Sequence, residues 1–211
     1  YYFFIFSIKK NLLFMKFLFD LGGVFFDWDP KYFYKNVFSD SKEMDFFLSK
    51  ICNDSWNSRQ DEGRSIEDGE NQIINLFPKF KKQIKMYYKN HKKMIKGVFK
   101  NSIEILAVLK KNNYKCYVLS NWSSETFMGM TEEYTFLKQF DDMIISGEHK
   151  LIKPNPLIYK LAINKFNLDP LNCVFIDDKY ENIDAAKQLG FLTIHLINPR
   201  TIKSEIEKFI I

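Results

Sequence analysis

The 211-residue sequence has few of the residues that build disulfides and zinc sites. It contains three cysteines without a Cys-x-x-Cys pair, and three histidines. A disulfide-stabilised secreted domain needs a denser and even-numbered set of cysteines, and a zinc site needs a cluster of Cys or His ligands. The composition disfavours both classes. Unpaired thiols are typical of a reducing compartment, so we expect a cytoplasmic protein.

Arginine is also scarce. It occurs only at Arg59, Arg64 and Arg200, so the formal charge of +5 comes from lysine. A surface that binds nucleic acid would bring arginines together with aromatic side chains on one face. The lysines instead form scattered pairs on predicted helix surfaces, which is typical of solvated faces. We therefore expect no nucleic-acid partner.

The apolar stretch at the start of the chain is too short to cross a bilayer, because Lys9-Lys10 interrupts it. A signal peptide would carry its positive charges before the apolar run, and here they follow it. We expect residues 1–14 to be an N-terminal extension that either precedes the true start of translation or is disordered. Met15 is then the natural first residue. We expect no membrane partner. A membrane-associating tail is the alternative interpretation.

What the sequence does contain is an alternation of short apolar runs with amphipathic stretches. Apolar runs predict buried strands, and apolar residues spaced three or four apart predict helices. The pattern indicates an α/β fold, in which a parallel sheet is interrupted once by an all-helical insertion. The predicted strands span residues 16–19, 115–119, 143–145, 173–176 and 192–196. The predicted helices span residues 32–38, 43–51, 66–76, 80–95, 101–111, 154–166 and 181–189.

Polar residues suited to chemistry follow the predicted strands. A carboxylate at the end of a parallel strand, with glycines after it, lies where open α/β sheets bind ligands. Adjacent carboxylates that end an apolar strand need a cation, and Mg²⁺ prefers oxygen ligands. A hydroxyl, an amide and an ammonium in the same crevice suit a phosphate. The residues are Asp20 with Gly22-Gly23, Ser120-Asn121, Lys153-Pro154 and Asp177-Asp178.

In this order the segments resemble the haloacid dehalogenase superfamily, and within subfamily IA the bacterial Asp-Leu-Gly phosphatases of the glucose-1-phosphate type. The resemblance extends over nearly the whole chain from Met15 onward. It implies a Rossmannoid three-layer α/β/α core formed by residues 15–29 and 97–211, and a small helical cap formed by residues 30–96. The segments that carry it are residues 19–24, Trp56 with Asp61 and Gly63, residues 119–123, 146–148, 153–159 and 175–178, and Asn182 with Ala185-Ala186 and Leu189-Gly190.

The resemblance implies a role for each strand-end residue. Asp20 would attack phosphorus and form an aspartyl-phosphate, and Lys153 would neutralise both the aspartate and the phosphate. Ser120 and Asn121 would hold the phosphoryl oxygens, and the backbone N–H of Gly23 would point at the phosphate. The implied substrate is a small phosphorylated metabolite.

The resemblance also implies a Mg²⁺ site. Asp20, Asp177, Asp178 and the backbone carbonyl of Gly22 would hold the ion, which lets two anions approach each other.

The cap would select the substrate. Trp56, Asp61 and Arg64 in the cap, and Trp122 beside the phosphate-binding pair, are candidate substrate contacts. The alternative is that both tryptophans are packing residues and Asp61 forms a turn.

One position departs from the family pattern. Most phosphatases of this superfamily carry a second Asp two residues after the nucleophile as general acid and base, and here that position is Gly22. Acid–base help is worth about 10²- to 10⁴-fold in rate. Either Asp27 or Asp29 substitutes, or the substrate is a sugar-1-phosphate with an acidic anomeric hydroxyl, or turnover is slow. We favour the sugar-1-phosphate.

Two other functions stay open. In a 2-haloacid dehalogenase, Asp20 would attack carbon without Mg²⁺, but the pair Asp177-Asp178 would repel a carboxylate substrate. The third interpretation is a catalytically weak relative that acts as a binding module, since Gly22 removes the usual acid.

Overall fold

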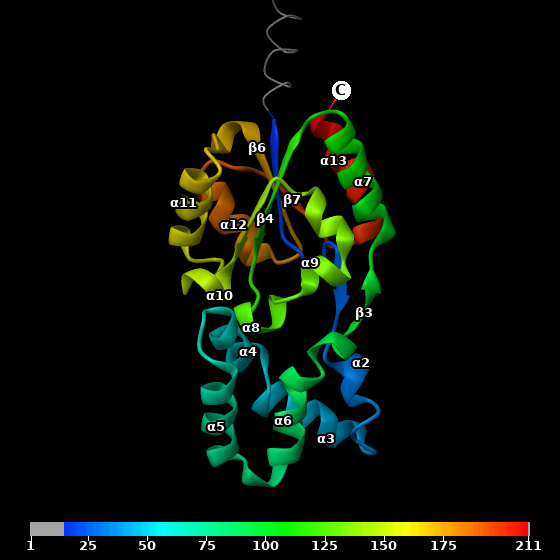
Figure 1. The fold of residues 1–211 in the computed structure, drawn as a ribbon, viewed down its shortest axis with the longest axis vertical. Coiled ribbons are helices and arrows are strands. Elements are labelled where there is room, and N and C mark those ends of the chain that lie inside the picture. The colour runs from blue at the N-terminus through cyan, green and yellow to red at the C-terminus, as the bar shows by residue number, and fades with distance from the viewer. Residues whose placement is uncertain (1–14, 211) are drawn as a thin grey trace, which may run out of the picture.

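The computed structural model describes residues 15–210, so the predicted N-terminal extension, residues 1–14, lies outside the described residues. The strands of the main sheet are β1 (Lys16–Phe19), β4 (Lys115–Ser120), β5 (Asp142–Ile145), β6 (Cys173–Asp177) and β7 (Leu192–His195). They are parallel and lie in the order β5-β4-β1-β6-β7 (Figure 1). The central strand β1 aligns Phe19 with Val118 of β4 and with Ile176 of β6, so these strands end at the same edge.

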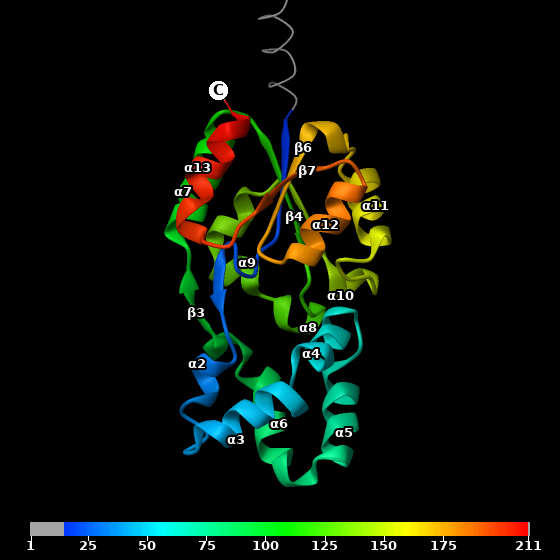
Figure 2. The same cartoon turned by 180° about the vertical axis from the view of Figure 1, so that it is seen from behind.

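Helices cover both faces of this sheet. They are α7 (Lys100–Lys111), α8 (Ser124–Phe127), α9 (Met130–Glu133), α10 (Ser146–His149), α11 (Pro156–Lys165), α12 (Tyr180–Gln188) and α13 (Ile202–Ile206). Alternate side chains of β1 point to opposite faces. Phe17 and Phe19 are buried with α7 and α13, whereas Leu18 is buried with α11 and α12. Figure 2 shows these two layers on either side of the sheet, which confirms the predicted α/β/α architecture.

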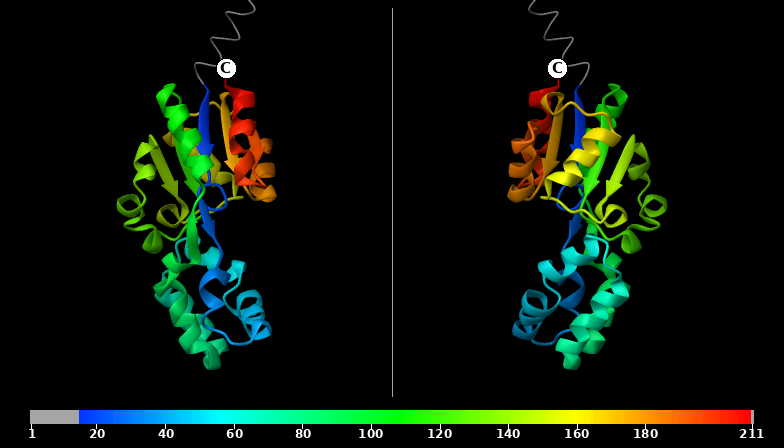
Figure 3. Two further views of the ribbon diagram at one scale, coloured as in Figure 1. Left: turned by 90° about the vertical axis from the view of Figure 1, so that its right-hand side faces the viewer. Right: turned by 90° about the vertical axis from the view of Figure 1, so that its left-hand side faces the viewer.

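A smaller, mostly helical part lies beyond the carboxyl ends of the strands (Figure 3). Its elements are α2 (Lys31–Tyr34), α3 (Ser41–Phe46), a π-helical turn (Phe47–Ile51), α4 (Asp54–Asp61), α5 (Ile66–Leu76) and α6 (Lys81–Lys89). An antiparallel pair, β2 (Phe26–Trp28) and β3 (Ile95–Val98), connects this part to the core. Its buried side chains form a separate, largely aromatic cluster that runs from Phe33 to Met94.

The inserted part differs from the prediction in three places, and the first is the helix predicted over residues 32–38, which ends at Tyr34. The sequence pattern does not predict α4, because this helix is polar and has no apolar repeat. The residue before the helix, Asn53, caps it, because its side chain accepts a hydrogen bond from the backbone N–H of Trp56 at 2.8 Å. The helix predicted over residues 80–95 ends at Lys89, and Ile95 begins strand β3 instead.

The boundaries of the two predicted domains, 15–29 with 97–211 and 30–96, stay a prediction, and strand β3 crosses the second boundary. In the part of the chain that the structure describes, no helix combines the length and the apolar character needed to cross a membrane.

Candidate active site

Three strands of the main sheet end at polar side chains that lie side by side. Because β1 is paired in register with β4 and β6, Asp20, Ser120 and Asp177 reach the same edge of the sheet. The backbone N–H of Asp20 donates to the carbonyl oxygen of Ile176 at 2.9 Å, which continues the pairing past the last residue of β1. All three side chains are buried, so each needs a polar partner.

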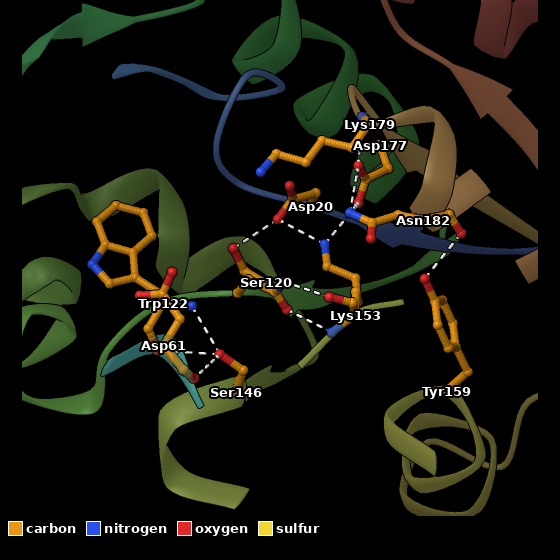
Figure 4. Close-up of polar contacts among 11 residues, drawn as sticks. Asp20, Asp61, Ser120, Trp122, Ser146, Lys153, Tyr159, Asp177, Lys179 and Asn182 are labelled. Carbon is orange, nitrogen blue, oxygen red and sulfur yellow. Dashed lines mark hydrogen bonds and ion pairs between the residues drawn. The ribbon is translucent and has the colours of Figure 1, made fainter. Parts of the chain in front are cut away.

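Lys153 links the two buried carboxylates. Its ammonium lies 3.0 Å from Asp20 Oδ1 and 2.7 Å from Asp177 Oδ2 (Figure 4). The hydroxyl of Ser120 donates to the same oxygen of Asp20 at 2.7 Å. Two buried anions around one buried cation leave a negative charge, and this favours a second cation at the same place.

The same contacts shift the pKa values of these groups. Burial raises the pKa of Asp20 above its ordinary value, the ammonium of Lys153 acts against this, and the charge of Asp177 adds to it. For Lys153, burial acts to lower the pKa, but Asp177 and Asp20 overcome it and the net shift is upward. The lysine is therefore the fixed positive charge of the site.

Asn121 holds the loop that carries Lys153. Its Nδ2 donates to the carbonyl oxygen of Lys153 at 2.9 Å, and the backbone N–H of Lys153 donates to Asn121 Oδ1 at 2.8 Å. This pair of bonds fixes the lysine loop to the segment that follows β4. The two residues expected to bind phosphate therefore differ in their contacts, because Ser120 touches Asp20 and Asn121 positions Lys153.

Three carboxylates form a candidate metal site. Asp20, Asp177 and Asp178 each offer an oxygen within 4.8 Å of the others, and such a set of hard donors fits Mg²⁺. Asp177 is already held by protein donors, since Asn182 Nδ2 lies 3.0 Å from each of its oxygens and the backbone N–H of Lys179 donates at 2.8 Å. Burial and repulsion from Asp20 and Asp177 raise the pKa of Asp178 to about 7. A cation would relieve this repulsion.

The two glycines after Asp20 have different surroundings. Gly23 has a φ of 66°, in the left-handed region, and a side chain at this position would collide with the carboxylate of Asp178. A Cβ at Gly22 would meet no atom within 4 Å. The geometry therefore requires glycine at position 23 but leaves room for a side chain at position 22.

A cavity of about 300 Å³ adjoins these groups, a size that suits a small metabolite. Its wall is built from the strand ends of the core and from the helical part. The lining residues are Asp20, Gly22, Gly23, Asn121, Trp122, Asp178, Lys179 and Asn182 on the core side, and Trp28, Asp54, Asn57, Ser58, Asp61 and His91 on the other.

Of the four candidate substrate contacts, Asp61 and Trp122 line this cavity. Trp56 is buried among the aromatic residues of the helical part, and its Nε1 donates to a backbone carbonyl at 3.0 Å. Arg64 donates from Nε to Gln60 Oε1 at 2.6 Å. The structure thus places Trp56 and Arg64 in the internal contacts of the helical part rather than in the cavity wall.

Asp61 is the last residue of α4 and is half-buried. Its Oδ2 accepts a hydrogen bond from Asn57 Nδ2 at 3.0 Å, and its carbonyl oxygen accepts one from Ser146 Oγ at 2.5 Å. The same hydroxyl accepts a hydrogen bond from the backbone N–H of Trp122 at 2.9 Å, so Ser146 joins the helical part to the core (Figure 4). Burial raises the pKa of Asp61 to about 7, although the ammonium of Lys179 acts against it.

The two carboxylates suggested as substitutes for the missing acid lie elsewhere. Asp27 accepts a hydrogen bond from the hydroxyl of Tyr32 at 2.7 Å, and Asp29 accepts one from the backbone N–H of Lys31 at 2.8 Å. Neither belongs to the described residues that line the cavity.

Seven of the described cavity residues have no site role in the sequence analysis, and they are Trp28, Asp54, Asn57, Ser58, His91, Lys179 and Asn182. Lys179 is the residue before α12, and Asn182 lies in the first turn of this helix. Asn182 follows Asp177 by five residues, and this spacing is the signal in the sequence that the two side chains meet. Trp28 lies in β2, and His91 lies in the turn that directly precedes β3. The sequence pattern predicts neither element. Burial lowers the pKa of His91 to about 4, so this imidazole is neutral at pH 7.

Comparison with known proteins adds independent information. A family model for haloacid dehalogenase-like hydrolases matches residues 40–196. Bifunctional epoxide hydrolase 2 of Mus musculus is 31% identical over 106 residues, which are 49% of this chain and 19% of that enzyme. The phosphorylated carbohydrates phosphatase of Thermotoga maritima is 24% identical over 180 residues, which are 84% of this chain and 82% of that enzyme.

Solved structures share the fold. A HAD family enzyme from Bacteroides thetaiotaomicron, in complex with magnesium and inorganic phosphate, has a TM-score of 0.65 and 24% sequence identity, covering 85% of this chain and 92% of that one. The chain spans less than a fifth of the length of the mammalian relatives that it matches at 31 to 33% identity.

Proposed function

Because the chain belongs to the haloacid dehalogenase-like hydrolase family, we propose that it is a Mg²⁺-dependent phosphomonoester hydrolase for a small phosphorylated metabolite. The observation that supports this most is the contact of Asp20 with Lys153 and Ser120 beside a cluster of three carboxylates. A nucleophile, a fixed cation and a hydrogen-bond donor at one end of a cavity are the groups that phosphoryl transfer needs. A relative that is a phosphatase and a structural neighbour with bound phosphate are consistent with it.

In the proposed reaction, an oxygen of Asp20 attacks phosphorus while the ester P–O bond breaks, which gives an aspartyl-phosphate. Water then attacks the same phosphorus, and the bond to Asp20 breaks to release inorganic phosphate. Lys153 compensates the charge of the phosphoryl group throughout. Ser120 and Asn121 hold the phosphoryl oxygens as charge develops on them. The backbone N–H expected to join them, that of Gly23, instead donates to the carbonyl oxygen of Phe26 at 3.0 Å, so it has no part in this step.

The residues proposed to hold Mg²⁺ are Asp20, Asp178 and the backbone carbonyl of Gly22, with Asp177 next to them. Bound there, the ion reduces the repulsion between the nucleophile and a phosphate dianion. The assignment is supported by the charge of the site, because one lysine faces three carboxylates. Asp178 is preferred to Asp177 as a direct ligand, because Asp178 lines the cavity and Asp177 is bound by protein donors.

The finer proposal for the substrate is a sugar-1-phosphate. Trp28 Nε1 and His91 Nδ1 are buried nitrogens without a hydrogen-bond partner among the described residues, and both side chains line the cavity. Both rings form part of the cavity wall, where a sugar would contact them. The anomeric hydroxyl is also more acidic than a simple alcohol, so its release depends less on the strength of a general acid. The Thermotoga maritima relative is named for phosphorylated carbohydrates.

The test is an assay of inorganic phosphate released from a panel of phosphorylated metabolites, with Mg²⁺ or with EDTA. We expect release that EDTA abolishes and excess Mg²⁺ restores, and a higher kcat/KM for a sugar-1-phosphate than for the matching 6-phosphate. Equal values would refute the sugar-1-phosphate preference. Halide release from a 2-haloacid in EDTA, without any phosphate release from the panel, would refute the phosphatase and indicate the dehalogenase instead.

A further inference from the structure

Hydrolysis of a phosphate ester needs a proton for the leaving oxygen and a base for the attacking water. Gly22, two residues after the nucleophile, has no side chain that can do either. We propose that Asp61, which the helical part places in the cavity wall, is the general acid and then the general base. The proposal rests on the phosphatase function above and adds a catalytic residue to it.

The cavity offers few alternatives. The titratable side chains among its described lining residues are Asp20, Asp54, Asp61, His91, Asp178 and Lys179. Asp20 is the proposed nucleophile, and Asp178 is a proposed metal ligand. Neither can also exchange a proton with the leaving oxygen, since each is committed as an anion in the same step.

The remaining groups are less suited than Asp61. His91 is buried among aromatic rings and lacks the proton of an imidazolium at neutral pH. Asp54 is exposed in the first turn of α4, at the opposite end of this helix from Asp61. Lys179 is an exposed ammonium that fits charge compensation of a phosphate better than proton return. Asp61 is the half-buried carboxyl that remains.

The contacts of Asp61 hold it in a fixed place over the core. Asn57, one turn earlier on α4, donates to its Oδ2, and Ser146 donates to its carbonyl oxygen. A second bond crosses between the two parts nearby, where the backbone N–H of Ile66 donates to Glu125 Oε1 at 2.8 Å. The carboxyl therefore keeps its position relative to Asp20, as an acid for the leaving group requires.

The charges around Asp61 allow both protonation states near neutral pH. Burial raises its pKa to about 7, the ammonium of Lys179 and a backbone N–H lower it, and the charge of Asp20 raises it. Tyr87 and Tyr88 of α6 face the same carboxyl, since its charge raises their own pKa values. A group with a pKa near the working pH can give a proton and take one back within a single cycle.

Each step then balances. As Asp20 attacks and the P–O bond to the alcohol breaks, the leaving oxygen keeps the electron pair of that bond and takes the proton of the Asp61 carboxyl. Asp61 is left as a carboxylate. It removes a proton from water while the water oxygen attacks phosphorus, and the bond to Asp20 breaks with its electron pair on the carboxylate. Alcohol and phosphate are released, and Asp61 is protonated again.

The first experiment replaces Asp61 with Asn, which keeps an oxygen that can accept the Asn57 bond but has no acidic proton. We expect kcat/KM with Mg²⁺ to fall by about 10²- to 10⁴-fold for glycerol 1-phosphate, whose leaving alcohol needs a proton. For p-nitrophenyl phosphate, whose leaving group needs none, the fall is at most about tenfold. Glu62→Gln, the neighbouring carboxylate, which pairs with Arg59 outside the cavity wall, is the matched control and changes neither value.

The second experiment uses the space at Gly22. A Cβ there meets no atom within 4 Å, so Gly22→Asp in the Asp61→Asn background is expected to recover at least tenfold on glycerol 1-phosphate. Gly22→Asn, which has the same shape but no acid, recovers nothing.

The outcomes separate the two proposals. An equal loss on both esters with Asp61→Asn, or no rescue by Gly22→Asp, refutes the acid–base role and leaves the phosphatase intact. If the unmodified protein with Mg²⁺ releases phosphate from neither ester, the phosphatase itself is refuted. Thermal unfolding of each variant identifies a loss that comes from misfolding.

Discussion

The core and the helical part bring aspartates to the same cavity in opposite electrostatic surroundings. Asp20, at the end of β1, accepts from the buried ammonium of Lys153 at 3.0 Å and from the hydroxyl of Ser120 at 2.7 Å. Asp61, at the end of α4, accepts from the uncharged amide of Asn57 at 3.0 Å. Both are carboxyls near one substrate space, but only the first has a cation in contact.

This difference assigns the two side chains different chemistry. Burial raises the pKa of both carboxyls, but the ammonium of Lys153 in contact with Asp20 acts against this and favours the anion that a nucleophile must be. A carboxyl that is desolvated without a cation in contact is easily protonated, as an acid must be. In the proposed mechanism, one role goes to a residue at the end of a sheet strand and the other to a residue of the insertion.

The largest effect on this contrast between Asp20 and Asp61 is expected from Asp20→Asn. The variant removes the nucleophile but keeps a side chain of the same shape beside Lys153, so we expect kcat to fall by roughly 10⁴-fold or more. Phosphate release with Mg²⁺ measures it. Hydrolysis within tenfold of the unmodified protein would show that another group attacks phosphorus, while hydrolysis absent from both proteins would indicate a binding module.

A second prediction concerns stability against pH. The folded-state pKa of Asp61 is about 7, above the ordinary value of 3.8, so the folded protein binds a proton that the unfolded chain releases between these values. Stability from this group is complete below pH 4 and is lost as pH rises to 7. One pKa unit is about 1.4 kcal/mol, so the loss is about 2–4 kcal/mol.

Asp61→Asn removes this dependence. In urea unfolding, the free energy of unfolding of the variant is expected to rise relative to that of the unmodified protein from pH 4 to pH 7. Above pH 7 the difference between the two proteins stays constant. Asp178 also has a raised pKa, but it is present in both proteins and cancels in the difference. Parallel stability curves for the two proteins would contradict the burial of an uncompensated carboxyl at position 61.

The two regions also differ in how far sequence reasoning reaches. The positions of the strand ends could be predicted from the sequence, because an apolar run indicates where a strand stops. Parallel pairing then brings these ends to one edge of the sheet. Asp20, Ser120 and Asp177 therefore lie together as the order of motifs indicates. Lys153 reaches them from a loop, and the pattern of other strand ends predicted its neighbours but not its two ion-pair distances.

The cavity residues of the helical part were harder to predict from the sequence, for a physical reason. Its surfaces depend on how short helices pack, and α4 has no apolar repeat that could reveal which side faces the cavity. Trp56 and Arg64 make hydrogen bonds within the helical part, whereas Asp61, at the end of α4, lines the cavity. His91 follows α6 in a turn whose burial only the tertiary structure determines.

A third prediction compares the glycines that follow Asp20. Gly23→Ala forces a side chain into the left-handed region and against Asp178, so we expect a loss of about 1–3 kcal/mol in the free energy of unfolding. Gly22→Ala meets open space, and its effect is expected within about 0.5 kcal/mol. Urea unfolding of both variants measures the contrast. Equal losses would mean that the turn after β1 is not held against Asp178 as described.

The smallest expected effect compares one tryptophan from each region. Trp56→Phe keeps an aromatic ring among Tyr87 and Tyr88 but removes the side-chain donor to the carbonyl of Gly69, which costs about 1–2 kcal/mol of stability. Because Trp56 lies inside the helical part, kcat/KM is expected to stay within about twofold. Trp122→Phe alters the cavity wall, so KM rises while stability changes less. If Trp56→Phe raised KM as much as Trp122→Phe, Trp56 would contact the substrate. The assignment of Trp56 as a packing residue would then be wrong.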